Sequence, residues 1–412
     1  MISKSPILVE RRQLDPTLID RYKAGHPKPL AKGTFRSLGL GLITGAADDD
    51  PSAIGTYAAA GASIGPSFLW TAPVTFPMMF SVVYLCSKLG QVAGQGLFAV
   101  IRAHYSRWLL YFFLITAVVG NIIEAGADLG GMAAALNVIV PVPIGGMVIL
   151  LGISVLSMQL WGYTLIRNIF RWLALALLAY VGSAIIAKPE LLSVIKGTFI
   201  PTIHFNKDFF AMLVAVIGTT REELRHSRRD VAFGMFFSNL VMFFIILSTA
   251  ATLFKVGKTD INTAAEAAQA LRPLAGSAAG LLFALGVVGV GFLAVPVMTI
   301  GAAFDLCQSF GWKHGLHARP KEAKPFYAAV VVFTLLAMAL NFFGINPMKA
   351  LVYAGIVQGF STPFLMLLVM LITNNRKIMG KWVNGRAMNI LGWITTAAMF
   401  AAAIGLIATL FI

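Results

Sequence analysis

The chain has 412 residues, of which 58% are hydrophobic and only 12% are charged, and its mean hydropathy is +0.81. Because soluble domains are about 25% charged, this composition excludes a water-soluble globular protein and predicts a multi-spanning integral membrane protein. The net charge of +15 does not indicate nucleic acid as a partner, since Lys and Arg collect in the cytoplasmic loops of membrane proteins.

Eleven apolar runs follow a polar N-terminal tail at residues 1–36, which has no apolar core of a signal peptide. A bilayer core about 30 Å thick needs roughly 20 apolar residues per helix, so the runs predict about 11 transmembrane helices and an all-α fold. A polar, Ala-rich connection at 255–276 predicts a short surface helix. The runs are 38–64, 69–89, 108–136, 144–160, 169–187, 209–220, 231–254, 280–304, 327–343, 350–373 and 390–412.

The loop charges support eleven crossings. With the N-terminus inside, 25 of the 32 Lys and Arg residues lie on the inner side, as the positive-inside rule requires. This arrangement puts the C-terminus outside and fits a bacterial plasma membrane. The excess of Lys and Arg on the inner side requires that the run 209–220 crosses the membrane. Its 12 residues, however, rise only about 18 Å as a helix, which is less than the thickness of the bilayer core. We therefore expect a half-helix there, completed by non-helical chain that lines a polar cavity.

An acidic triplet interrupts the first run at Asp48, Asp49 and Asp50, directly before Pro51. Proline removes a backbone donor and disfavours helix at the preceding residue, and an Asp at a helix centre costs about 2.5–3.5 kcal/mol. We interpret the triplet as a helix break whose carbonyls and carboxylates form a cation site with oxygen ligands. Alternatively, the span starts later and the triplet is a solvated cap.

The run 209–220 resembles the start of the first run, because both are apolar stretches that end at Gly or Thr and then meet acidic residues. They lie five spans apart. Interrupted helices at matching positions in two halves are typical of inverted-repeat secondary transporters, although a chance match is the alternative for so short a stretch. The pattern predicts a transmembrane domain at 37–412, with repeats at 37–187 and 209–373 and an extra helix at 390–412.

The third run carries Asn121, Glu124 and Asp128 at spacings that put all three on one helical face. A polar stripe in a membrane helix faces the bundle or a water path rather than lipid. It is either an ion or proton relay or a packing stripe tied to neighbouring helices, and Gln358 is a further candidate for lining the path. The sequence contains no nucleotide-binding or hydrolase motif, so we expect no enzyme activity and no cofactor.

The runs in order, and the segment Thr44-Gly-Ala-Ala-Asp-Asp-Asp-Pro-Ser52, resemble the NRAMP family of divalent metal transporters. The resemblance implies a LeuT-like 5+5 inverted repeat with broken helices 1 and 6, and a metal ion as transported substrate. Typical members read Asp-Pro-Gly-Asn at the first break. Asp50 matches the metal-binding carboxylate of that motif, whereas its amide ligand is missing at Ala53.

In typical members the sixth helix supplies an Ala carbonyl and a Met thioether, followed by Pro-His. The matching stretch here begins at Ala215, which keeps the carbonyl, while the thioether and the His are absent; Thr219 and Asp49 are further candidate oxygen donors. Thioether sulfur favours softer metals, so an all-oxygen site suits Mg²⁺ or Mn²⁺. Asp128 matches a proton-path Asp, but its usual Glu partner is Gly131, which leaves proton symport open.

The sequence thus predicts secondary transport of divalent metal cations (Mn²⁺/Fe²⁺-type or Mg²⁺) by alternating access, with the metal ion and the lipid bilayer as partners. An ion-coupled carrier of a small organic solute on the same fold is one alternative, and a transport-inactive scaffold or sensor is another. The scaffold or sensor alternative arises because typical family members continue helix 6 with a second apolar half. This chain instead runs directly into the charged segment 221–230. Either that half is lost or the sequence skips residues there.

Overall fold

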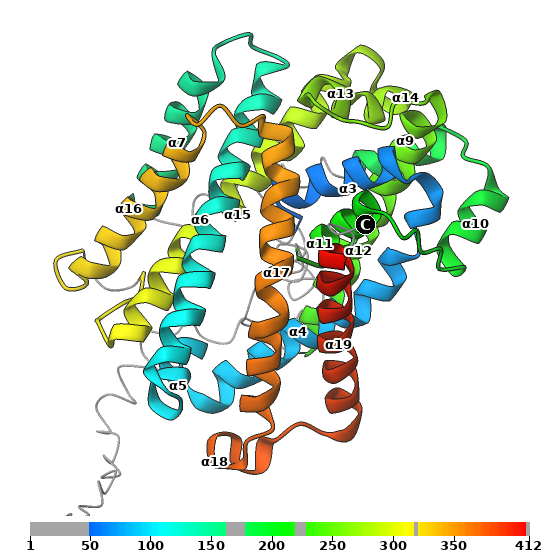
Figure 1. Cartoon of the computed structure of the whole chain (residues 1–412). Helices are drawn as coiled ribbons and strands as arrows, with labels where there is room; N and C mark the ends of the chain where they lie inside the picture. The colour runs from blue at the N-terminus through cyan, green and yellow to red at the C-terminus, as the bar shows by residue number, and fades with distance from the viewer. Residues whose placement is uncertain (1–48, 162–177, 219–227, 317–319, 409–412) are drawn as a thin grey trace, which may run out of the picture.

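The computed structural model describes residues 49–161, 178–218, 228–316 and 320–408 (Figure 1). Within these ranges every regular element is a helix, which confirms the all-α prediction. The helices are α3 Pro51–Ser63, α4 Thr71–Ala93, α5 Leu97–His104, α6 Arg107–Asn137, α7 Ile144–Trp161, α9 Ala179–Ile186, α10 Leu191–Phe199, α11 Lys207–Gly218, α12 Arg228–Thr252, α13 Ala264–Ala268, α14 Arg272–Ala275, α15 Ala279–Phe310, α16 Lys324–Leu340, α17 Pro347–Thr373, α18 Arg376–Met379 and α19 Arg386–Ala408.

Six helical segments of the described chain are long and apolar enough to cross a membrane, and two further apolar helices, α7 and α16, are somewhat shorter. Eight of the predicted runs coincide with helices to within a few residues, namely α4, α6, α7, α12, α15, α16, α17 and α19. The run 209–220 is the short helix α11. Of the first and fifth runs, the structure describes α3 and α9, and the rest lies outside the described residues.

The connection 255–276 contains short helices, as expected: α14 has no buried residue and is a surface helix, whereas α13 is partly buried. Ala264, Ala267 and Ala268 are buried, because α13 packs its small side chains against α15 and α6. Thr263 and Glu266 form a capping box that fixes the start of this helix. Ala-rich sequence therefore served close packing here rather than exposure.

Helix α3 lies at the centre of the bundle, where it packs against α12, α17, α6 and α11 (Figure 1). All of its residues except Ala59 and Ser63 are buried. Helices α6 and α15 pack along each other beside it, and α17 lies across both α6 and α11. Any polar group on α3 is therefore enclosed by other helices rather than by lipid.

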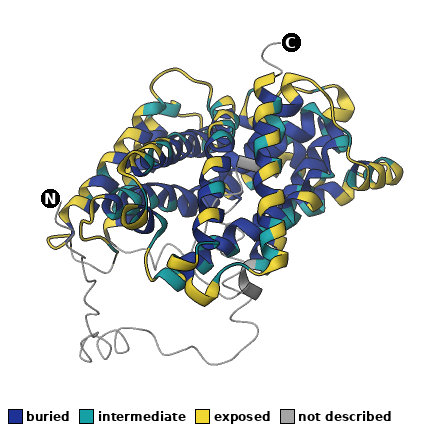
Figure 2. Cartoon of the chain, turned by 60° about the horizontal axis from the view of Figure 1, so that its bottom comes forward, coloured by how far each residue is buried: buried dark blue, intermediate teal, exposed yellow. Residues whose placement is uncertain are grey.

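Large apolar side chains cover outer faces of the molecule, and Figure 2 shows the exposed residues on the outside of the buried interior. Phe112 and Ile115 on α6 and Leu150 and Ile153 on α7 are all more than half exposed. Soluble monomers rarely expose large contiguous apolar surface, whereas lipid tails stabilise it. The protein is therefore an integral membrane protein.

Replacing Gly61 by alanine should destabilise the contact between α3 and α12. A methyl group at Gly61 would overlap Thr249 Oγ1 and the backbone carbonyl oxygen of Ile246, and the backbone cannot rotate away. Overpacking of this kind costs about 1–3 kcal/mol. We expect a lower thermal unfolding temperature in detergent for Gly61→Ala. Gly301→Ala is the matched control, because a methyl at Gly301 meets nothing within 4 Å; equal unfolding temperatures would contradict the prediction.

Candidate functional site

The chain is not helical at Asp49 and Asp50, and α3 begins at Pro51. Proline is tolerated at this first position because its missing N–H would have no partner there. Asp50 is the N-cap: its Oδ1 accepts a 2.6 Å hydrogen bond from the backbone N–H of Ala53. Both carboxylates are buried, at 0% and 2% exposure. The alternative of a solvated cap is thus half right, because Asp50 caps a helix but is not in solvent.

Asp128 on α6 is bonded to the start of α3. Its Oδ1 accepts hydrogen bonds from both the backbone N–H and the hydroxyl of Ser52, at 2.9 Å and 2.6 Å. Its Oδ2 is buried and has no hydrogen-bond partner among the described residues. Buried polar atoms are nearly always paired, so this oxygen is suited to an ion, a proton or a water. Within the described chain, neither Asp50 nor Asp128 forms an ion pair with Lys, Arg or His.

The stripe Asn121, Glu124 and Asp128 is buried, as its position on one helical face predicted. Glu124 accepts a short hydrogen bond from Nε2 of Gln358 on α17, so packing between α6 and α17 explains part of the stripe. Asp50, Glu124 and Asp128 are all buried, so three carboxyl groups lie inside the bundle. Gln358 itself is 0% exposed and therefore lies inside the bundle.

Ala215 is buried on α11. A methyl group built on Gly355 of α17 would lie 3.3 Å from both the carbonyl oxygen of Ala215 and Oγ1 of Thr56. Thr56 follows Asp50 by six residues, about 9 Å along α3. The structure therefore brings Ala215 to Thr56 rather than showing it at Asp50. Thr219 lies outside the described residues.

Sequence reasoning missed two hydroxyl groups at this site, those of Ser52 and Thr56. Ser52 belongs to the motif that drew attention to Asp50, so its polar side chain in an apolar helix was an available signal. Thr56 is one of many hydroxyl residues in apolar runs, and nothing in its sequence context distinguishes it. Its role depends on contacts with α11 and α17, which are distant in sequence.

All of the donors brought together here are oxygen atoms. The described residues include no group of three or more His, Cys, Asp and Glu side chains arranged to hold a metal. Carboxylates, backbone carbonyls, hydroxyls and water are the ligands of hard cations, and Mg²⁺ in particular keeps several waters. The set therefore suits a partly hydrated divalent cation in transit better than a fully caged resident ion.

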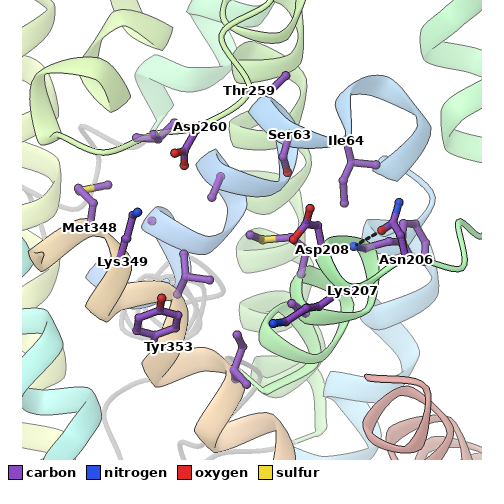
Figure 3. A pocket seen from close by; sticks show the side chains of 18 of the residues that line it. Ser63, Ile64, Asn206, Lys207, Asp208, Thr259, Asp260, Met348, Lys349 and Tyr353 are labelled. Atoms are coloured by element: carbon purple, nitrogen blue, oxygen red, sulfur yellow. Dashed lines mark hydrogen bonds between the residues drawn. The ribbon is translucent and has the colours of Figure 1, made fainter. Parts of the chain in front are cut away.

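A cavity of about 880 Å³ lies between α3, α11, α17 and the loop at 259–261 (Figure 3). Four charged residues are exposed on its walls: Lys207 and Asp208 from α11, Asp260 from the loop and Lys349 from α17 (Figure 3). Its buried lining reaches Gly55, which precedes Thr56. The cavity therefore extends from these charged side chains at the surface to the buried part of α3 at Gly55.

Buried carboxylates at the start of a helix that is enclosed by apolar, membrane-spanning helices are typical of an integral membrane transporter. The natural resistance-associated macrophage protein-like family model matches residues 41–221 and 219–409, and the chain belongs to this family. The two matches overlap at residues 219–221.

Named relatives agree with this assignment. The chain is 26% identical over 372 residues to the divalent metal cation transporter MntH of Klebsiella pneumoniae (strain 342), covering 84% of this chain and 88% of the relative. The manganese transporter of Eremococcus coleocola superposes with a TM-score of 0.68 at 17% identity, covering 93% and 88%. Mhp1, a nucleobase-cation-symport-1 family transporter, superposes at 0.55 and 12% identity, covering 90% and 92%. These structures share the fold.

Proposed function

We propose that this protein carries divalent metal cations across the membrane as a secondary transporter. The observation that carries the proposal is a set of two buried carboxylates, Asp50 at the start of α3 and Asp128 on α6, which is bonded to Ser52 of α3. No basic side chain of the described residues forms an ion pair with either. Buried carboxylates inside a membrane bundle are costly unless a cation or proton accompanies them. The family, and the metal transport in the names of relatives, support the same function.

In this proposal the metal is bound at the helix break. Asp50 is the principal ligand, with Asp49, the Ala215 carbonyl and Thr219 as further oxygen donors at successive stages of transport. Carboxylates supply the charge that replaces part of the hydration shell, and carbonyls and water complete the coordination. Asn121, Glu124, Asp128 and Gln358 form the polar path that continues from the break along α6.

The arrangement in the membrane is also a proposal: eleven crossings, a cytoplasmic N-terminus, an outer C-terminus and a bacterial plasma membrane. The proposal also includes broken helices 1 and 6, repeats at 37–187 and 209–373 and an extra helix at 390–412. The non-helical residues Asp49 and Asp50 before α3 support the first break. In this topology Lys207 and Lys349 are external, so the cavity beside α3 is the outer vestibule.

The oxygen donor atoms predict which metal ions the protein prefers. We expect Mg²⁺ to compete well with Mn²⁺ uptake into proteoliposomes, and Cd²⁺ to show no advantage over either, because oxygen donors do not favour soft cations. The measurement is inhibition of Mn²⁺ uptake by a concentration series of each ion. A strong Cd²⁺ preference would contradict the all-oxygen site. It would indicate a sulfur donor, for which Met132 is a candidate because its Sδ lies beside Gly291 and near Pro51.

Transport of a small organic solute is the second candidate, favoured by the size of the vestibule and by Lys207 and Lys349 on its walls. Cavities of about 300–1,000 Å³ hold such solutes, and a lysine can bind a carboxylate. Uptake of Mn²⁺ and Mg²⁺ by proteoliposomes, against empty liposomes, separates the candidates. Metal uptake supports the first, whereas folded protein that moves neither ion favours the second or a transport-inactive scaffold.

A further inference from the structure

A second cavity, of about 600 Å³, lies between the end of α17, the start of α19 and the short connection from α5 to α6. Figure 1 shows this end of the bundle at the bottom, where α18 connects α17 to α19. Four side chains form the polar part of its lining: Tyr105, Asn374, Asn375 and Asn389. Leu371 and Trp393 line its apolar part and are 49% and 40% exposed. The cavity therefore has a polar part and an apolar part that is open on the outside of the bundle.

The side chains along α19 change from charged to apolar in the direction of the bilayer core. Arg386, Asn389 and Trp393 are spaced by three and four residues, so they share one face of the helix over about 10 Å. Arg386 begins α19 and is exposed. Ile390 and Ile394 beside this face are more than half exposed, as expected of side chains that contact lipid. A phospholipid has the same order of groups, from phosphate through ester to acyl chain.

The hydrogen bonds of the cavity leave donors for a ligand. Nδ2 of Asn374 donates to the carbonyl oxygen of Met370 at 2.9 Å and to Oδ1 of Asn389 at 2.8 Å. Because a backbone carbonyl only accepts, this pair of bonds fixes the orientation of both amides. Asn389 therefore uses its oxygen within the protein, and its two N–H groups can bind a phosphate or ester oxygen.

The connection from α17 to α19 is strongly basic. It contains no Asp or Glu between residues 374 and 386. Its four basic residues are all exposed: Arg376, Lys377, Lys381 and Arg386. None of them forms an ion pair with an acidic residue in the part of the chain that the structure describes. Trp382, which is 59% exposed, lies beside Lys381, and exposed Trp is typical of the headgroup level of a membrane. The charge of this surface favours an anionic headgroup.

We propose that the cavity between α17 and α19 binds an anionic phospholipid. The phosphate lies at Arg386 and Asn389, and an acyl chain follows Leu371 and Trp393 toward the bilayer core. Basic pockets between membrane helices bind anionic headgroups in this way. The collection of Lys and Arg in loops explains the charges alone, whereas the cavity and its apolar, exposed side fit a lipid better than a soluble anion. The site is separate from Asp50 and does not depend on which ion the protein carries.

The test compares two lipids on the full-length protein in detergent. Phosphatidylglycerol, which is anionic, and phosphatidylcholine, which is zwitterionic, are titrated separately, and bound lipid is counted by native mass spectrometry. We expect wild type to bind phosphatidylglycerol about tenfold more tightly, because several cations near a membrane surface attract an anionic lipid. Arg386→Gln should weaken phosphatidylglycerol binding about fivefold and leave phosphatidylcholine binding unchanged, since one of these cations is lost.

A second variant tests the cavity rather than the charge at its edge. Asn389→Asp keeps the oxygen that accepts from Asn374 but replaces the two N–H donors by a negative charge. We expect it to lose the preference for phosphatidylglycerol while its thermal unfolding temperature stays close to wild type. Lys324→Gln is the matched control, because Lys324 is an exposed cation at the start of α16, which packs against α6, α7 and α15.

Three results would overturn the lipid site. The first is equal affinity of the wild-type protein for the two lipids. The second is an equal loss of phosphatidylglycerol binding in Arg386→Gln and Lys324→Gln, which would show that the basic surface acts without the cavity. The third is complete displacement of phosphatidylglycerol by inorganic phosphate, which would identify a site for a soluble anion.

Discussion

Asp50→Ala is expected to abolish Mn²⁺ uptake into proteoliposomes, with a loss of about a hundredfold or more, equivalent to roughly 2.8 kcal/mol. The variant removes the carboxylate at the helix break, and within the described chain that carboxylate is buried without a basic partner. Initial rates of Mn²⁺ and Mg²⁺ uptake, measured side by side with wild type, give the result. Both ions should lose their path, because both use the same oxygen.

Asp50→Asn separates the charge of this residue from its structural role. An Asn side chain also caps helices, so it retains the acceptor that the Ala53 N–H uses. Asp50→Ala loses that cap, at a cost of about 1 kcal/mol. We expect Asp50→Asn to unfold near the wild-type temperature and yet to lose uptake. Transport by Asp50→Asn at the wild-type rate would show that the charge is not needed and would refute the metal site.

Substitution of Asp128 should have the second-largest effect. Asp128→Ala removes the acceptor of two buried donors, the N–H and the hydroxyl of Ser52, and each unpaired donor costs about 1–3 kcal/mol. The start of α3 then loses its connection to α6. We expect uptake to fall more than tenfold and the thermal unfolding temperature to fall with it, both measured on the same preparation.

Asp128→Asn is the matched variant. Its amide oxygen can still accept from Ser52, so the amide nitrogen must take the place of Oδ2, which has no partner among the described residues. We expect the fold to be retained and uptake to fall about tenfold, because a donor replaces an acceptor at a site for cations. A pH series distinguishes the two roles of Asp128: a proton relay predicts that the variant loses its pH dependence, whereas a metal-facing oxygen predicts weaker uptake at every pH.

Much of the helical architecture could be predicted from the sequence, because lipid imposes a strong and local requirement for about 20 apolar residues per crossing. The run 144–160 and α7 Ile144–Trp161 differ by one residue. The run 209–220 likewise coincides with α11 over the residues that the structure describes. The buried packing of Ala264 and Ala267 did not follow from the sequence, because small residues suit both an exposed helix and a close contact.

The candidate site could be predicted only in part. Asp50 was predictable because three acidic residues and a proline in an apolar run contradict a continuous helix. The hydrogen bond between Ser52 and Asp128 was not predictable, because these residues are 76 positions apart and their bond depends on how α3 packs on α6. Thr56 and Ala215 likewise both lie close to Gly355, and the three residues belong to helices that are far apart in sequence.

The carboxyl group that binds the metal in this proposal also fixes the first turn of α3. Oδ1 of Asp50 accepts from Ala53, and the carbonyl of Asp50 accepts from Ile54 at 3.0 Å. A cation that shares Oδ1 weakens the Ala53 bond, so the loaded and empty proteins differ in how firmly this turn is held. By thermodynamic reciprocity, any change that frays or tightens the turn also alters affinity for the ion. Ion binding and the stability of the first turn of α3 are therefore thermodynamically coupled, and a change in either one changes the other.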